Sequence, residues 1–568
     1  VTLAGETGGI HSVSGNGYSL VLDYICGTSI GEGGVAAENL ASLSVINGLT
    51  NLNGSVETTG AQTYANGTVA LTGGSALQGE AVTFGKGLAA NGHDLSLNFT
   101  QPTAVSDTGF SGLANLTSVG PVVLSGQIDS VGFQNYAAAA TLDADTTLNA
   151  TGNVSFGGTV DGARQLNVQS GGAVNFFAAL GSTTPLQGLN LSSASAVAAL
   201  GTFAINGTGA GSDGLLIGTT VNNVNIAQPG STITNANLAG IRFAGGSQNY
   251  TVGGFTITGS GGSGVSVEAG DYTGSVFASS TLTGSGGDGL RAQNATGLTV
   301  RDTRSSGNAG SGLWFEGAGT TGVVVSNNSL GIDAAGNAAQ PNVNFGLMLY
   351  GVSGGEVANN TIGGNTRYGV VVETAAANVV VSDNLIGTNE NGDSLGNGND
   401  GILVKDATNV AVTGNRIANN EYYGMQLYNS QNVTVGGSIA AQQGNVFLNN
   451  RQYGIALRLD LTGSVVQGNY IDGGEEAGIY ISSAQNVTVG SVSADLANEV
   501  TGYDHGIMAG GDCSGTIVVG NNIHDNVIDG VRLLEAQNLT VLRNAVRDNG
   551  LYGSLAVGDN TGTQLGGN

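Results

Sequence analysis

Charge, cysteine and proline are scarce in this sequence. Charged residues make up 10% of the 568 residues, and 14 basic residues stand against 40 acidic ones, for a formal net charge of −26. An acidic excess of this size repels phosphates, so it argues against nucleic acid or an anionic membrane surface as a partner. The two cysteines, Cys26 and Cys513, stand almost at opposite ends of the chain, and we expect no disulfide between them.

Long apolar runs are absent as well. No stretch of about 20 apolar residues occurs, so no membrane-spanning helix is expected. No signal peptide opens the sequence, and we expect the chain to be a mature protein or a fragment. The five prolines are far outnumbered by 100 glycines, which follow no collagen period. Small residues in such number suit tight corners and closely stacked backbones.

A short motif recurs between Gly240 and Gly553. It consists of a glycine followed by apolar, variable and apolar positions, and its clearest copy is Gly401-Ile-Leu-Val404. The other copies follow at spacings of 23 to 32 residues and open at Gly346, Gly369, Gly424, Gly454, Gly478, Gly506 and Gly530. A repeat of this length is the mark of a solenoid, in which each repeat contacts only its neighbours.

A second motif, Val-x-x-Asn-x-aliphatic, follows the openings. Its seven copies begin at Val325, Val357, Val381, Val412, Val466, Val518 and Val541. Each repeat therefore holds three apolar segments that are too short for helices and alternate with the period of two that strands have. We predict an all-β fold, a three-sided right-handed parallel β-helix, with the hand taken from the general rule for parallel crossovers.

The motif also places an asparagine at the same corner of successive coils. We expect these side chains to stack inward as a ladder, because an amide has donors and an acceptor for its own bend and for the next coil. The predicted structural ladder consists of Asn328, Asn360, Asn384, Asn415, Asn445, Asn469, Asn498, Asn521 and Asn544.

Regularity and charge divide the chain into three predicted parts. Residues 1–55 are expected to be an N-terminal cap or irregular β segment, 56–239 a degenerate β-solenoid, and 240–568 a regular parallel β-helix with the asparagine ladder. Only Lys86 and Arg164 are basic before residue 240, which supports a boundary there.

Two family resemblances follow from these patterns. The run from Tyr64 through Val82-Thr-Phe matches the run from Tyr136 through Val154-Ser-Phe at an offset of 72 residues. This pattern, over about 56–200, resembles the repeats of filamentous haemagglutinin-like adhesins, although their Asn-Pro-Asn-Gly secretion motif is absent. Residues 240–568 resemble the right-handed β-helix repeats of pectate-lyase-like enzymes, phage tailspikes and giant bacterial surface proteins. Both resemblances imply an extracellular or cell-surface protein.

Two long insertions, Gly331 to Asn344 and Gly387 to Asp400, interrupt the repeats. The second one spaces oxygen-bearing side chains as a hard cation requires, and its candidate metal ligands are Asn389, Asn391, Asp393 and Asp400. Calcium is the one cofactor that this pattern favours. A plain solvated turn is the alternative, since the glycine and terminal glutamate of a helix-loop-helix calcium site are missing.

The residue just before each opening glycine forms a partly aromatic stripe. Candidate glycan-binding residues in it are Tyr368, Tyr423, Tyr453, His505 and Tyr552. Aromatic faces flanked by acids bind sugar rings, but stacked like residues are also an ordinary way to stabilise a β-helix. The nearest catalytic candidate is a patch of ionisable residues that consists of Arg458, Asp460, Asp472, Glu475, Glu476, Asp504 and His505. No family motif can be fitted to this patch, and we assign no catalytic residue.

The sequence leaves two functions open. Uniform coils favour a non-catalytic extracellular structural or adhesive protein, an acidic rod of a surface fibre, layer or matrix. The alternative is a polysaccharide-binding or polysaccharide-modifying β-helix protein. Expected partners are copies of the same chain, stacked laterally or head to tail because the sequence stops partway through a coil, and extracellular polysaccharide.

Overall fold

The computed structural model is built almost entirely of β-strands. It describes residues 2–5, 8–10, 13–14, 16–31, 37–208, 212–245 and 249–568, and within these the 3₁₀ turn η1 (Ala494–Leu496) is the one helical element. The chain divides into two units, Val1–Thr256 and Ile257–Asn568. The predicted all-β parallel β-solenoid is confirmed. Several positions of the predicted cap (1, 6–7, 11–12, 15 and 32–36) lie outside the described residues.

Unit 1 consists of short parallel coils. In β15 (Val122–Ser130) and β17 (Ala140–Ala150), Val122 lies opposite Ala140, so one coil takes 18 residues here. The 72-residue offset in the sequence therefore spans several coils. Parallel pairing already joins β4 (Leu20–Tyr24) to β7 (Leu43–Val45), within the region predicted as a cap.

Aromatic rings fill part of the core of unit 1. The rings of Tyr136, Phe156 and Phe176 stack on three successive coils, with centroids 5.1 and 5.5 Å apart, and all three are buried. These rings come from the Tyr and Val-x-Phe positions of the repeat. Stacked aromatic rings on successive coils stabilise the fold by more than the burial of their surface alone.

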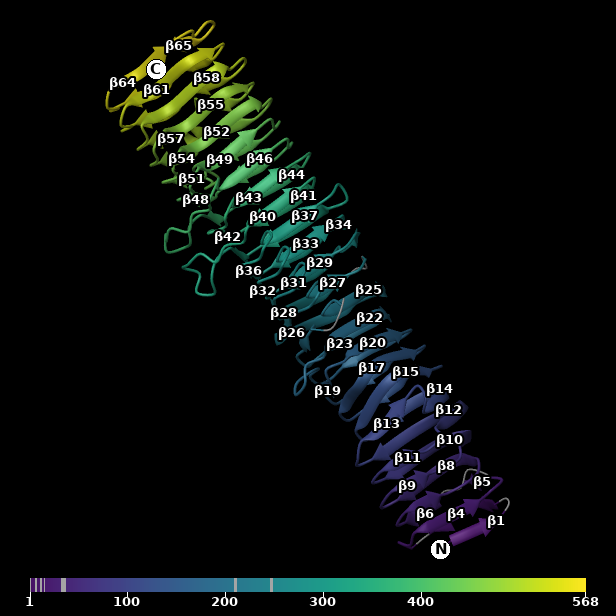
Figure 1. The fold of residues 1–568 in the computed structure, drawn as a ribbon. Coiled ribbons are helices and arrows are strands. Elements are labelled where there is room, and N and C mark those ends of the chain that lie inside the picture. The colour runs from purple at the N-terminus through teal and green to yellow at the C-terminus, as the bar shows by residue number, and fades with distance from the viewer. Residues whose placement is uncertain are drawn as a thin grey trace. The chain divides into compact units, whose positions relative to one another are not determined.

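From β37 (Leu313–Glu316) to β63 (Ala545–Arg547), each coil of unit 2 has three strands. The coil that begins at Gly401 contains β46 (Ile402–Lys405), β47 (Ala411–Thr413) and β48 (Arg416–Ala418). Its inward side chains Ile402, Val404, Val412 and Ile417 are fully buried. Figure 1 shows the corresponding strands of successive coils lying side by side through this unit.

The strands of unit 2 form three parallel sheets. The first sheet contains β33 (Leu290–Gln293), β37 (Leu313–Glu316), β40 (Leu347–Tyr350), β43 (Val370–Glu373), β46, β49 (Tyr423–Tyr428), β52 (Tyr453–Asp460), β55 (Ala477–Gln485), β58 (His505–Asp512), β61 (Asp529–Gln537) and β64 (Tyr552–Val557). The second contains β38 (Thr321–Ser326), β41 (Ser353–Ala358), β44 (Ala377–Ser382), β47, β50 (Thr434–Gly436), β53 (Val465–Gln467), β56 (Thr488–Val489), β59 (Ile517–Val519), β62 (Thr540–Leu542) and β65 (Gln564–Gly566). The third contains β32 (Thr281–Thr283), β36 (Arg304–Ser306), β39 (Ser329–Leu330), β42 (Thr361–Ile362), β45 (Leu385–Ile386), β48, β51 (Val446–Leu448), β54 (Tyr470–Asp472), β57 (Glu499–Thr501), β60 (Asn522–His524) and β63 (Ala545–Arg547).

The nine asparagines of the predicted ladder lie above one another, between the second and third sheets. Asn384 Nδ2 donates to Asn415 Oδ1 at 2.9 Å, and Asn415 Nδ2 donates to Asn445 Oδ1 at 3.0 Å. The same contact joins every neighbouring pair from Asn328 to Asn544. Each amide also donates to backbone carbonyls, so the buried corner has partners for its polar groups.

A second asparagine ladder stands at the corner between the third and first sheets. Its amides donate to one another at 2.9 to 3.0 Å along Asn342, Asn365, Asn397, Asn420 and Asn450. Each of these asparagines comes four residues before an opening glycine. A Cβ on Gly401 would lie 2.7 Å from Asn420 Nδ2 and 2.6 Å from the carbonyl oxygen of Gly424, so the ladder requires glycine there.

Candidate functional site

The side of the first sheet that faces away from the core carries two columns of side chains, and we call it the outer face. One column comes from the variable position of the glycine motif and runs in register through Trp314, Met348, Val371, Leu403, Gln426, Ala456, Tyr480, Met508 and Arg532. The other is the stripe before the opening glycines, which runs in register through Tyr423, Tyr453, Ala477, His505, Asp529 and Tyr552.

Aromatic rings gather in two groups on the outer face. Tyr423, Tyr453 and Tyr480 stack with centroids 5.0 and 4.5 Å apart. Trp314, Phe345 and Tyr368 form the other group, at 6.2 and 5.8 Å. Because the rings of Tyr423 and Tyr453 cover each other, these residues are only 6 and 7% exposed, and a ligand would meet their edges rather than their faces. Tyr552, at the end of the stripe, is 53% exposed.

Cationic side chains lie over these rings. The guanidinium of Arg291 lies 5.2 Å from the centre of the Trp314 ring, and that of Arg458 lies 5.7 and 5.8 Å from the rings of Tyr423 and Tyr480. Two more pairs of this kind are Arg367 with Phe345 and Tyr368, and Lys405 with Tyr428. Contacts of this type are worth about 0.5–2 kcal/mol each, so they hold the cations in place on the face.

Several donors on the outer face have no hydrogen-bond partner although they are buried. They include Trp314 Nε1, Arg458 Nε and Arg532 Nε. Buried polar groups in folded proteins nearly always have a partner, and leaving one unpaired costs about 1–3 kcal/mol. These donors are therefore unpaired in this conformation, and a ligand would reach them only after neighbouring side chains moved.

The stripe also contains a buried ionisable group, Asp529, which lies opposite Tyr552. Asp529 is fully buried, and its Oδ2 lies 3.3 Å from His505 Nδ1 and 3.5 Å from Arg532 Nη1. Arg532 Nη1 also lies 3.2 Å from His505 Nε2. Burial, together with the charge of Arg532, lowers the pKa of His505, so its imidazole is neutral at neutral pH.

Asp400 lies in the middle of the outer face. It is 1% exposed and accepts a hydrogen bond from the backbone N–H of Tyr423 at 3.2 Å. Burial raises the pKa of Asp400 to about 7, against the opposing effects of that hydrogen bond and the charge of Arg458. Burial also raises the pKa of Tyr423 to about 12, and its phenol oxygen accepts a hydrogen bond from Arg458 Nη2 at 3.0 Å. Asp400 can thus take up or release a proton near neutral pH.

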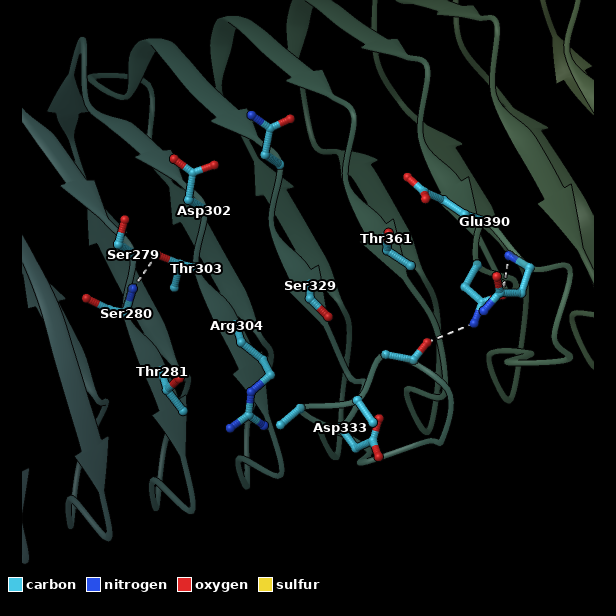
Figure 2. A pocket seen from close by; sticks show the side chains of 16 residues that line it. Ser279, Ser280, Thr281, Asp302, Thr303, Arg304, Ser329, Asp333, Thr361 and Glu390 are labelled. Carbon is cyan, nitrogen blue, oxygen red and sulfur yellow. Dashed lines mark hydrogen bonds between the residues drawn. The ribbon is translucent and has the colours of Figure 1, made fainter. Parts of the chain in front are cut away.

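The two inserted loops form a second site, a groove of about 850 Å³ over the third sheet. Each loop is closed by an antiparallel bridge, Ile332 with Ala339 and Thr388 with Ser394. Asn389 Nδ2 donates to the carbonyl oxygen of Gly336 at 2.8 Å and so joins the loops. Figure 2 shows the floor, where Thr281, Arg304, Ser329 and Thr361 lie on successive strands, with Asp333 and Glu390 of the loops at its side.

Comparison with known protein families settles the classification of the chain. The model of the right-handed β-helix region matches residues 204–339, 239–400 and 400–568, which together make up more than half of the chain. The chain belongs to the right-handed β-helix family. The matched ranges begin at residue 204, so the resemblance of residues 56–200 to haemagglutinin-like repeats stays a prediction.

Solved structures similar to this β-helix have low identity and low TM-scores. The periplasmic alginate epimerase AlgG is 10% identical, over 78% of this chain and 77% of its own, with a TM-score of 0.29. The A-module of the Azotobacter vinelandii mannuronan C-5 epimerase AlgE6 is 14% identical, over 71% and 90%, with a TM-score of 0.30. The Dettilon tailspike protein is 14% identical, over 60% and 61%, with a TM-score of 0.34. No curated protein matches this chain.

The predicted metal ligands of this β-helix lie in two places. Asn389, Asn391 and Asp393 share the second loop, where Asn389 Oδ1 accepts the backbone N–H groups of Asn391 and Asp393 at 3.0 Å and Nδ2 donates to Asp393 Oδ2 at 2.7 Å. Asp400 instead belongs to the outer face. Within the described ranges, no group of three or more His, Cys, Asp or Glu side chains is arranged to hold a metal ion. Calcium binding stays a prediction.

The residues of the ionisable patch, which the sequence suggested as a catalytic candidate, also lie in different parts of the coils. Arg458 and His505 lie on the outer face, and Glu476 joins them by accepting a hydrogen bond from the Tyr453 hydroxyl at 2.6 Å. Asp460 bonds to Thr462 in the turn after β52, and Asp472 accepts a hydrogen bond from the Tyr470 hydroxyl on the third sheet.

In the part of the chain that the structure describes, no helix is long and apolar enough to cross a membrane.

Sequence reasoning missed the column of the variable position. The residues that mark it are Trp314, Tyr480, Met508 and Arg532. A signal was present, because a position between two inward apolar residues of a strand must face outward, and large apolar residues recur there. The cations over the rings share no single position: Arg291 stands at the variable position itself, opposite Trp314, whereas Arg367 stands two residues before Gly369.

Proposed function

We propose that this β-helix binds an extended polysaccharide along the outer face of the first sheet of unit 2. The observation that carries the proposal is the coincidence, on one face, of aromatic rings and of cations held over them. In keeping with the sequence, we propose an extracellular or cell-surface location.

The chemistry of a sugar chain fits these groups. A sugar ring has apolar C–H surfaces that pack against aromatic side chains, and hydroxyl or carboxylate oxygens that accept hydrogen bonds. Guanidinium groups donate through a planar fork that matches a carboxylate, and the side chain of Arg532 is 30% exposed. Coils repeat about every 4.8 Å, so the face offers similar groups at a regular interval to a polymer of similar units.

Chemical modification of the bound chain is a second candidate, and one observation favours it. Asp400 has a pKa near 7 because it is buried, and it lies beside Tyr423 and Arg458. A group with such a pKa is suited to proton transfer at neutral pH. At 1% exposure Asp400 does not reach a ligand in this conformation, so binding, without turnover, is the leading proposal. The structural rod expected from the sequence stays the alternative and requires none of these features.

Affinity electrophoresis against gels that contain a neutral glucan, polygalacturonate or alginate tests the proposal. We expect at least one polymer to retard the protein, and Tyr480→Ala and Arg532→Gln each to weaken binding about tenfold, the equivalent of ~1.4 kcal/mol. Arg416→Gln, on the exposed side of the third sheet, is the matched control and should bind as the wild type does. Absence of retardation by every polymer, or equal retardation of all variants, contradicts the proposal. Unsaturated or shortened products would favour modification.

A further inference from the structure

We infer that the groove between the two inserted loops is a separate binding site for a short, non-anionic oligosaccharide. It lies over the third sheet, on another side of the coil from the outer face, so it does not depend on polysaccharide binding there. The inference rests on the volume of the groove, the fixed position of its walls, and the chemical character of its lining.

The floor of the groove is a column of polar side chains in register. Thr281 lies opposite Arg304, Arg304 opposite Ser329, and Ser329 opposite Thr361. Figure 2 shows these four side chains on successive strands, facing the same space. Four strands at a spacing of ~4.8 Å span ~14 Å, about the length of a trisaccharide.

The corner beside this floor carries further polar groups. Ser279, Asp302 and Asn327 line the groove, and their backbones have φ values of 52°, 51° and 55°. Residues other than glycine adopt this left-handed region infrequently, and Asn and Asp do so at the lowest cost. The coil therefore turns at this corner while presenting a polar side chain each time, which adds a second row of donors and acceptors.

The walls are held in place by hydrogen bonds between the loops and the floor. Asn389 Nδ2 bonds to the carbonyl oxygen of Gly336 and so joins one loop to the other. Arg304 Nη1 donates to Gln340 Oε1 of the first loop at 3.0 Å and to Ser306 Oγ at 2.9 Å. A ligand would find these walls already positioned, which lowers the entropic cost of binding.

The lining determines the class of ligand. It contains no aromatic side chain, so the ligand is held by hydrogen bonds to hydroxyl, amide and carboxylate groups. Asp302, Asp333 and Glu390 give the groove three carboxylates against one lining cation, Arg304, and Asp302 is also paired with Arg301, so the lining keeps a net negative charge. The resulting negative potential repels uronate and sulfate groups and favours neutral or amino-substituted sugars.

Calorimetric titration with four trisaccharides tests this assignment on the full chain. The probes are cellotriose, triacetylchitotriose, the glucosamine trimer and trigalacturonate. We expect saturable binding of at least one of the first three, and binding of trigalacturonate that is weaker by about tenfold or more, the equivalent of ~1.4 kcal/mol. Failure of the first three to bind, or equally tight binding of trigalacturonate, overturns the inference.

Variants on the floor assign the binding to the groove. Ser329→Trp places a large ring in the middle of the floor and should abolish binding, whereas Ser329→Thr keeps the hydroxyl and should retain it. Circular dichroism of both variants checks the fold. Undiminished binding by a folded Ser329→Trp variant would place the ligand elsewhere and overturn the assignment. Tyr480→Ala, on the outer face, should leave trisaccharide binding unchanged, so the two sites can be judged separately.

Discussion

At the scale of single residues, burial decides the chemistry of the outer face more than residue type does. Asp400 and Asp529 occupy equivalent positions before an opening glycine, and both are almost fully buried. The hydrogen bond from the Tyr423 N–H and the charge of Arg458 both lower the pKa of Asp400, but burial outweighs them and raises it to about 7. Asp529 lies at ion-pair distance from His505 and Arg532.

The stability of the protein should therefore depend on pH through Asp400. Its folded pKa of about 7 is above the ordinary value of 3.8, so the unfolded chain loses this proton first and stability falls as pH rises from 4 to 7. Asp400→Asn removes the effect. Denaturant unfolding at pH 5 and pH 8 should show the wild type losing about 2–3 kcal/mol relative to Asp400→Asn, at 1.36 kcal/mol per pKa unit. A constant difference between the two proteins would show that Asp400 does not carry the shifted pKa.

At the scale of elements, the strands and one asparagine ladder could be read from the sequence, whereas the second ladder was missed. The strands follow from the period of two, because inward positions such as Ile402 and Val404 must be apolar. The Asn-x-x-x-Gly spacing of Asn397 and Asn420 was also visible, but inserted loops precede several of its copies and obscured the period. The contact between the two loops depends on the side chain of Asn389 and could not be predicted from spacing alone.

The asparagine ladder offers a test with adjacent residues. Asn521 Nδ2 donates to Asn544 Oδ1 at 2.9 Å and to the carbonyl oxygen of Val489 at 3.0 Å, whereas Asn522 is the next residue and half-buried outside the ladder. Asn521→Ala should lower the free energy of unfolding by about 3 kcal/mol, because it leaves several buried groups without partners. Asn522→Ala should cost less than ~0.5 kcal/mol. Equal thermal unfolding midpoints for the two variants would contradict a stabilising role of the ladder.

At the scale of the whole molecule, the two units share parallel coils but differ in charge. Lys86, Arg164 and Arg242 are the basic residues of unit 1, so the other eleven of the fourteen belong to unit 2. Five of these eleven, Arg291, Arg367, Lys405, Arg458 and Arg532, lie on the outer face. Arg291, Lys405 and Arg532 are paired with Glu316, Asp406 and Asp529, so the face carries both signs of charge in a chain whose net charge is −26.

The single tryptophan of the chain, Trp314, tests the central claim most directly, because it lies on the outer face with Nε1 unpaired. Among the described residues, its cationic and aromatic neighbours are Arg291, 5.2 Å from the ring centre, and Phe345, with ring centres 6.2 Å apart. A polysaccharide bound along the face should change its surroundings. Titration with a polymer that retards the protein is predicted to shift the tryptophan emission until saturation, with the shift reduced in Arg532→Gln at equal polymer concentration. Retardation by a polymer that leaves the emission unchanged at every concentration would show that binding occurs elsewhere and would contradict the account.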